Sequence, residues 1–115
     1  MSKPVRGYLF DDYAEIPFTS EPAKYYVGTN ALASDPDLLK TYPMLAKNPD
    51  NGQPGFTAHS ALLYATQDCW VWFNREKAVR HFIPAGVWFT FNRMIHTLYV
   101  VRDTADGTLM VHFEG

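Results

Sequence analysis

Residues 87–113 read VWFTFNRMIHTLYVVRDTADGTLMVHF, and this stretch decides the fold class. Its first six residues alternate along the chain, and alternation with a period of two is typical of a β-strand with one buried face. The residues expected on the core face are Val87, Phe89 and Phe91, with Trp88 on the opposite face. Further on, residues 95–102 and 108–113 are rich in β-branched and aromatic side chains and flank turn-forming residues. The stretch therefore predicts three successive strands.

Outward from this stretch, residues 60–115 predict six short strands joined by connectors with turn chemistry. The predicted strands are Ser60–Thr66, Cys69–Phe73, Val79–Ile83, Val87–Asn92, Ile95–Arg102 and Thr108–Phe113. In Cys69–Phe73 both faces are apolar, which indicates a strand covered on both sides. We therefore expect an all-β fold, an antiparallel β-sandwich or a small jelly-roll-like barrel formed by residues 60–115.

Residues 1–59 differ in character, because they hold most of the eight prolines of the chain. Proline removes a donor from a β-ladder and restricts the residue before it, so this half predicts an extended amino-terminal arm. We expect short strands at Tyr8–Phe10 and Lys24–Val27. A helical turn is expected at Asp35–Lys40, with Ser34 as its N-cap. The fold thus contains at most one short helix.

Composition limits the classes of function. At 115 residues the chain predicts a single domain, and its formal net charge of −2 without a basic block argues against nucleic-acid binding. No apolar run approaches the length of a membrane helix, and no signal-peptide pattern opens the chain. We expect a soluble protein made in the cytoplasm, with no membrane partner. Aromatic residues are 16% of the chain, more than a small core needs, which indicates an interface.

One motif is similar to a metal-binding family. Residues 81–92 resemble the second cupin motif, in which Pro-x-Gly-x-x-His supplies a metal ligand, and Pro84 and Gly86 match it. Phe89 stands at the ligand position and cannot coordinate a cation, and the first cupin motif is absent. The sequence therefore favours a cupin-like sandwich without metal over a metal-dependent cupin.

Four histidines, His59, His81, His96 and His112, are the remaining candidate metal ligands. Zinc requires three or four converging ligands, and no HxH or HxxxH spacing is present. If the last two strands pair through a turn at residues 106–107, His96 and His112 lie on opposite faces. Cys69 is expected to be a buried structural thiol rather than a nucleophile. We expect no catalytic residue, no cofactor and no metal site.

Residues 82–91, 95–102 and 105–115 resemble the ending of many small virion proteins of tailed bacteriophages and prophages. In those proteins a Pro-Ala-Gly turn, an aromatic strand, a strand with a Tyr-Val pair and a Gly-Thr-Leu strand close a β-sandwich. The resemblance implies a non-enzymatic structural protein that decorates or cements the capsid or joins head and tail components. It also implies localisation to the virion, synthesis in the host cytoplasm, other virion proteins as partners, and a homo-oligomer, for which we favour a trimer.

Aromatic and aliphatic anchors rather than charges are expected to carry the affinity of such contacts. The candidate interface residues are Phe18, Tyr25, Tyr26, Leu38, Leu39, Trp70, Trp72 and Trp88. Two alternatives remain open: a cupin-like small enzyme, and a carbohydrate-binding sandwich with exposed aromatic residues on one sheet face.

Overall fold

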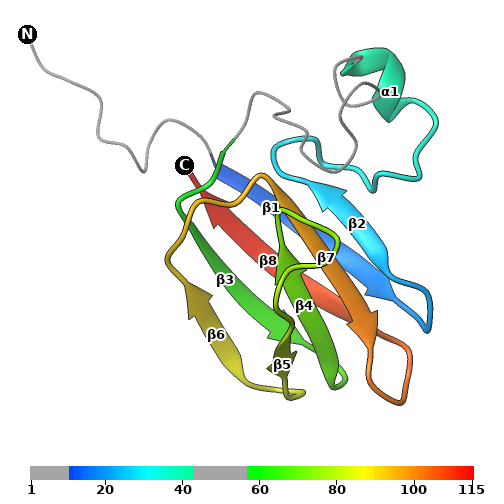
Figure 1. Cartoon of the computed structure of the whole chain (residues 1–115), viewed down its shortest axis with the longest axis vertical. Coiled ribbons are helices and arrows are strands. Elements are labelled where there is room, and N and C mark those ends of the chain that lie inside the picture. The colour runs from blue at the N-terminus through cyan, green and yellow to red at the C-terminus, as the bar shows by residue number, and fades with distance from the viewer. Residues whose placement is uncertain (1–10, 43–56) are drawn as a thin grey trace, which may run out of the picture.

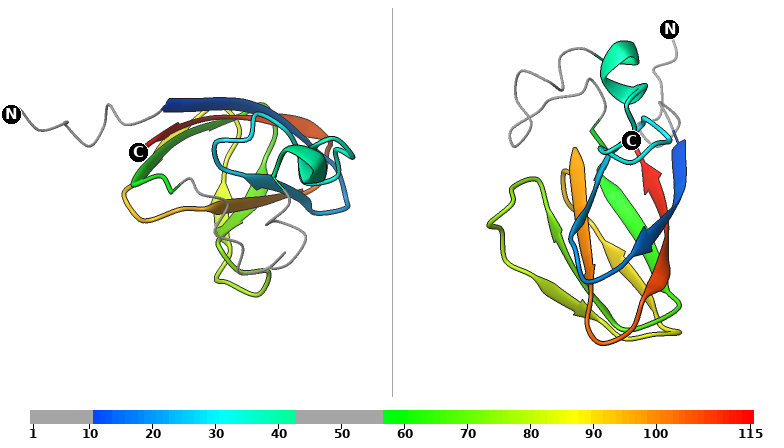
Figure 2. Two further views of the ribbon diagram at one scale, coloured as in Figure 1. Left: turned by 90° about the horizontal axis from the view of Figure 1, so that it is seen from above. Right: turned by 90° about the vertical axis from the view of Figure 1, so that its right-hand side faces the viewer.

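The computed structural model describes residues 11–42 and 57–115, and in them eight strands form two sheets that pack face to face (Figure 1). The strands are β1 (Asp11–Phe18), β2 (Ala23–Tyr26), β3 (Ser60–Ala65), β4 (Cys69–Phe73), β5 (His81–Ile83), β6 (Trp88–Phe91), β7 (Thr97–Arg102) and β8 (Gly107–Glu114). Sheet A has the order β1-β8-β3-β6 and sheet B the order β2-β7-β4-β5. Figure 2 shows the two layers edge on.

The strand pairing is that of a jelly roll. Strand β1 pairs with β8, β2 with β7, β3 with β6, and β4 with β5, all antiparallel. The first strand thus pairs with the last, the second with the seventh, and so on inward, as in one long hairpin. When such a hairpin folds into two packed sheets, the eight strands form a jelly roll. The remaining ladders, β3 with β8 and β4 with β7, join these pairs within each sheet. The prediction of an all-β antiparallel sandwich is confirmed.

The core lies between the two sheets and consists of alternate residues of each strand. In β1, buried and exposed residues alternate along all eight positions, and Ile16 and Phe18 are each 1% exposed. The central side chains of β3 and β8, Leu63 and Val111, are fully buried. In β6, Phe89 packs against this core while Trp88 faces outward, as predicted. Val87 lies before the strand and is exposed, so its expected core position is wrong.

Residues 11–27, expected in an extended arm, instead supply one strand to each sheet. Strand β1 pairs with β8 along its whole length, and β2 pairs with β7. Pro17 is accommodated because β1 is the edge strand of sheet A, where a missing N–H donor is tolerated. The predicted strand Lys24–Val27 is found one residue earlier, as Ala23–Tyr26. The predicted strand Tyr8–Phe10 lies outside the described residues.

A buried carboxylate fastens β1 to the residues after β2. Asp12 is 3% exposed and accepts hydrogen bonds from the Tyr25 hydroxyl at 2.7 Å and from the backbone N–H of Gly28 at 2.6 Å. The Tyr25 oxygen in turn accepts from the backbone N–H of Asn30 at 3.0 Å. The Tyr25 ring stacks on Phe113 of β8, with the ring centroids 5.8 Å apart. The end of the sandwich is thereby tied together by both polar and aromatic contacts.

The one helix in the described residues is the single turn α1 (Leu38–Thr41). It begins three residues later than predicted, and its N-cap position is held by Asp37 rather than Ser34. The Asp37 side chain makes no capping hydrogen bond. Leu38 packs against Tyr26 in a small satellite cluster, which is what holds so short a helix. None of the described helical residues forms a segment long and apolar enough to cross a membrane.

The last two strands, β7 and β8, do not pair with each other. Strand β7 lies in sheet B and β8 lies in sheet A, so residues 103–106 cross between the sheets. Gly107 begins β8 where the chain is tightly enclosed: a Cβ atom there would lie 2.8 Å from the Phe18 ring and 2.8 Å from Thr66 Oγ1. Because the connector reaches the opposite layer, the hairpin on which the expected placement of His96 and His112 depended does not form.

Candidate functional site

The outer face of sheet A presents two rows of side chains that run across all four strands. One row consists of Tyr13, His112, Leu62 and Thr90, and the next consists of Glu15, Met110, Tyr64 and Trp88. Neighbouring strands lie about 4.8 Å apart, so each row spans about 14 Å. The intervening residues of each strand point into the core, so the sequence alternation itself places these side chains on the outside.

An apolar groove lies within these rows. We name it the outer groove and define it by its lining residues, Tyr13, Leu62, Trp88, Met110 and His112, which enclose about 430 Å³. Trp88 is 62% exposed and Tyr13 is 53% exposed, one at each edge of the sheet. The Trp88 ring packs on Tyr64 with the centroids 4.8 Å apart, so its position is fixed by a neighbour. Aromatic side chains held this exposed are typical of a binding surface.

Carboxylates border the outer groove. Asp11 and Glu114 pair with each other across β1 and β8, one row beyond Tyr13 and His112. Glu15 accepts a hydrogen bond from the Tyr13 hydroxyl at 3.2 Å, and Asp11 lies 3.6 Å from the His112 ring. The four strands of sheet A contain no lysine or arginine. The groove is therefore apolar at its centre and acidic at its border.

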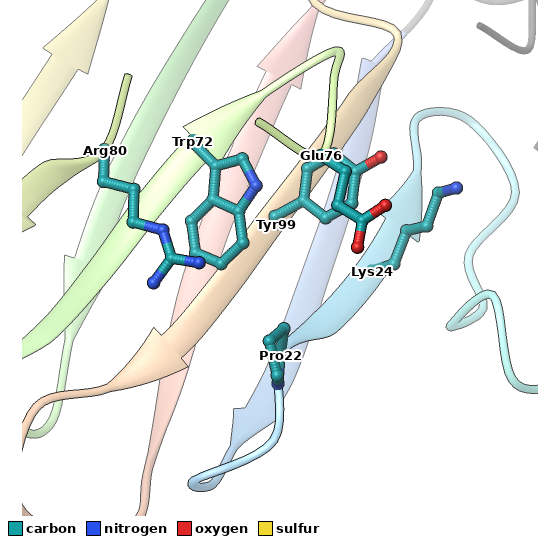
Figure 3. Close-up of a pocket in the computed structure, with 6 residues that line it drawn as sticks. All are labelled: Pro22, Lys24, Trp72, Glu76, Arg80 and Tyr99. Carbon is teal, nitrogen blue, oxygen red and sulfur yellow. The ribbon is translucent and has the colours of Figure 1, made fainter. Parts of the chain in front are cut away.

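The outer face of sheet B carries a different feature, a pocket of about 290 Å³ that Figure 3 shows. It is lined by Pro22, Lys24, Trp72, Glu76, Arg80 and Tyr99. The Trp72 and Tyr99 rings are stacked, with centroids 5.3 Å apart and planes 4° from parallel. The Arg80 guanidinium lies 4.0 Å from the Trp72 ring centroid at one end, and Lys24 Nζ lies 5.5 Å from the Tyr99 centroid at the other.

This pocket is a cation-capped aromatic stack rather than a ligand platform. Trp72 is 1% exposed and Tyr99 is 4% exposed, so neither ring offers a free face to a ligand. Each cation over an aromatic ring contributes about 0.5–1 kcal/mol or more where it is desolvated. The stack covers the outer side of β4 and β7, which explains why both faces of Cys69–Phe73 are apolar.

The structure separates the predicted interface residues into two groups. Phe18, Tyr25, Tyr26, Leu38 and Trp72 are buried within the chain, so they are packing residues and not surface anchors. Trp70 is half-buried, and its indole N–H donates to Asp103 Oδ1 at 3.1 Å. Trp88 is the member of the set that lies exposed, and the outer groove contains it. For Leu39 the structure describes the backbone alone.

The four histidines are not brought together into a metal-binding group. No cluster of three or more His, Cys, Asp or Glu side chains occurs among residues 11–42 and 57–115. His81 lies against Phe73 and Phe91, and His96 Nδ1 lies 2.9 Å from the Thr97 hydroxyl. Phe89, at the cupin ligand position, packs on the core. Burial raises the pKa of the Cys69 thiol to about 12, which suits a packing residue and not a nucleophile.

Tyr13, Leu62 and Met110 line the outer groove beside Trp88 but are not among the interface residues that the sequence predicts. The alternation in β1, where Ala14, Ile16 and Phe18 take every second position, is a signal that marks Tyr13 as outward-facing. Leu62 carries no such signal, because apolar residues precede and follow it.

Comparison of the chain with protein-family models, curated proteins and solved structures finds no match.

Proposed function

We propose that this chain is a non-enzymatic structural protein that joins other proteins in an assembled particle, with the outer groove as its contact surface. The observation that carries the proposal is the outer groove itself, an apolar surface with exposed aromatic side chains on an otherwise well-packed sheet. Aromatic anchors around an apolar centre with charges at the rim are the usual composition of a protein interface.

The particle we propose is the virion of a tailed bacteriophage, in which the chain decorates or cements the capsid or joins head and tail parts. The resemblance of residues 82–115 to small virion proteins supports this setting. The jelly roll is also an architecture that viral capsid proteins use, although lectins and cupins use it as well, so the fold alone does not choose among them. The protein is then made in the host cytoplasm and retained in the particle.

The test is the presence of the chain in particles. Particles are purified by density gradient from the cells that make the chain and probed with an antibody against it. We expect the chain to sediment with the particles in a fixed ratio to their main subunit. Confinement of the chain to the unassembled protein fraction overturns the proposal.

A variant pair then tests the contact surface. Trp88→Ala removes the most exposed ring of the outer groove, whereas Met94→Ala removes a side chain of similar exposure, 64%, outside the groove. We expect Trp88→Ala to lower incorporation at least about tenfold, as loss of an aromatic anchor does at interfaces, and Met94→Ala to leave it unchanged. Equal incorporation of both variants shows that the groove is not the contact surface.

Carbohydrate binding is the second candidate, because Tyr13, Tyr64 and Trp88 lie on one sheet face. The predominance of apolar groups such as Leu62 and Met110 in the groove favours a protein partner, since sugars require many hydrogen-bonding groups. Binding of the chain to a glycan array, lost in Trp88→Ala, would support the carbohydrate reading instead.

A further inference from the structure

We propose that the outer groove of one copy binds the loop between β4 and β5 of a second copy, so that copies of this chain associate head to tail. We name residues 74–80 the basic loop. The inference rests on the proposed function, because it names one partner of the same groove. Contacts of this kind between copies would form the homo-oligomer that the resemblance to virion proteins implies.

The basic loop carries an apolar tip between cations. Val79 is 78% exposed, the largest exposed fraction among the large apolar side chains of the described residues. Arg75, Lys77 and Arg80 surround it in the sequence, and Glu76 is the one acidic residue of the loop. Arg93 joins them in space, because it and Arg75 line the same cavity of about 460 Å³ with Val79.

Hydrogen bonds from Asn74 anchor the first residue of the basic loop. The Asn74 side chain donates to the backbone carbonyl of Met94 at 2.9 Å and accepts from the backbone N–H of His96 at 2.9 Å. Asn74 itself has φ 71°, in the left-handed region that asparagine tolerates better than most residues. Within the loop, the Ala78 N–H donates to the Arg75 carbonyl at 3.1 Å. Anchoring of the loop at its base reduces the conformational entropy that is lost when the loop binds.

The charges of the two surfaces are complementary. Ten lysines and arginines occur in the chain, and three of them, Lys3, Arg6 and Lys47, lie outside the described residues, which leaves seven. Four of the seven are the three cations of the basic loop and Arg93. The outer groove has an apolar centre and the three carboxylates of Asp11, Glu15 and Glu114 at its border. Arg80 caps the Trp72 ring, so Arg75, Lys77 and Arg93 are the cations left beside the apolar tip. An apolar tip flanked by these cations fits an apolar groove bordered by carboxylates.

The two surfaces lie on opposite sides of the sandwich. Figure 2 shows the basic loop, in yellow-green, projecting on the sheet B side, away from the outer face of sheet A. One copy can therefore offer its loop to one neighbour and its groove to another. Such heterologous contacts produce a closed ring when the rotation between copies closes, and an open chain when it does not. A contact of groove with groove would instead bring carboxylates together.

Two variants that each destroy one half of the contact provide the test. The groove variant carries Trp88→Ala and Glu15→Lys, and the loop variant carries Val79→Asp and Lys77→Glu. Circular dichroism and thermal unfolding verify that both fold. Native mass spectrometry and analytical ultracentrifugation then measure subunit number for wild type, each variant, and their equimolar mixture. Lys40→Glu makes the same charge change as Lys77→Glu but on α1, where the Lys40 side chain is 83% exposed, and serves as the control for that substitution.

We expect wild type and Lys40→Glu to form a ring or a concentration-dependent chain, and each groove or loop variant alone to be monomeric. The mixture is expected to form a one-to-one dimer, because the loop variant retains its groove and the groove variant retains its loop. A loop variant that still associates overturns the head-to-tail arrangement. Monomeric wild type overturns self-association, while the proposed function is then judged separately by the presence of the chain in particles.

Discussion

Replacing Tyr25 with phenylalanine tests whether this residue belongs to the core network or to an interface. The change removes the hydroxyl that donates to buried Asp12 at 2.7 Å and accepts from the N–H of Asn30 at 3.0 Å, while it retains the ring that stacks on Phe113. A hydrogen bond to a charged group contributes about 1.5–3 kcal/mol, so we expect a loss of about 2 kcal/mol in the free energy of unfolding. For 115 residues the entropy of unfolding near 60 °C is about 0.24 kcal/mol/K, so Tm should fall by about 8 °C.

Tyr13 supplies a matched control. Its hydroxyl also donates to a carboxylate, that of Glu15 at 3.2 Å, but the residue is exposed. Tyr13→Phe should therefore leave Tm unchanged when both proteins are measured at a concentration at which the chain is monomeric. Thermal unfolding followed by circular dichroism measures both variants, and a double-mutant cycle with Asp12→Ala isolates the coupling between Tyr25 and Asp12. Equal Tm values for wild type and Tyr25→Phe would refute the argument, because the buried carboxylate would then not depend on this donor.

Two further predictions concern the packing and the titration of the sandwich. Gly107→Ala should lower the free energy of unfolding by about 1–3 kcal/mol in urea denaturation, because the new Cβ would lie 2.8 Å from both the Phe18 ring and Thr66 Oγ1; an unchanged midpoint would show that these side chains move aside freely. Burial, and secondarily the charge of Lys24, lowers the pKa of His96 in the folded protein. The unfolded state therefore binds a proton at His96 more readily than the folded state does. The free energy of unfolding should decrease as the pH falls below about 6.5, the ordinary pKa of histidine. Denaturation midpoints measured between about pH 5 and 7 should decrease less in His96→Gln than in wild type, and identical pH dependence in the two proteins would contradict the assignment.

The strands of residues 60–115 could be predicted from local pattern because their signal is dense. Cys69–Phe73 has the predicted bounds, and β3, β6 and β8 differ from their predicted bounds by a residue at one or both ends. The strand β1 was missed because Pro17 and three acidic residues obscure its apolar alternation. An edge strand tolerates both, since one side of its ladder faces solvent. A proline in an alternating run fits an edge strand and an irregular arm equally well, so the local pattern does not choose between them.

The candidate site was predictable only in part. The alternation of residues 87–92 marks Trp88 as outward-facing, and the structure places it in the outer groove. The large aromatic side chains of Tyr25 and Trp72 are as compatible with a protein interface as with the core of the chain. The structure shows that both are buried within this chain. Side-chain size predicts that a residue will be covered, but not whether its own chain or a partner covers it.

Local sequence pattern is sufficient to predict the all-β class, most of the strands and their inward and outward faces, because the two-residue period of a strand is a local property of the backbone. Strand pairing, in contrast, depends on the tertiary structure. Strand β8 lies between β1 and β3 and not beside β7, which places His112 between Tyr13 of β1 and Leu62 of β3. Register between distant strands depends on how two sheets close over a shared core, and so the outer groove exists only after the jelly roll has formed.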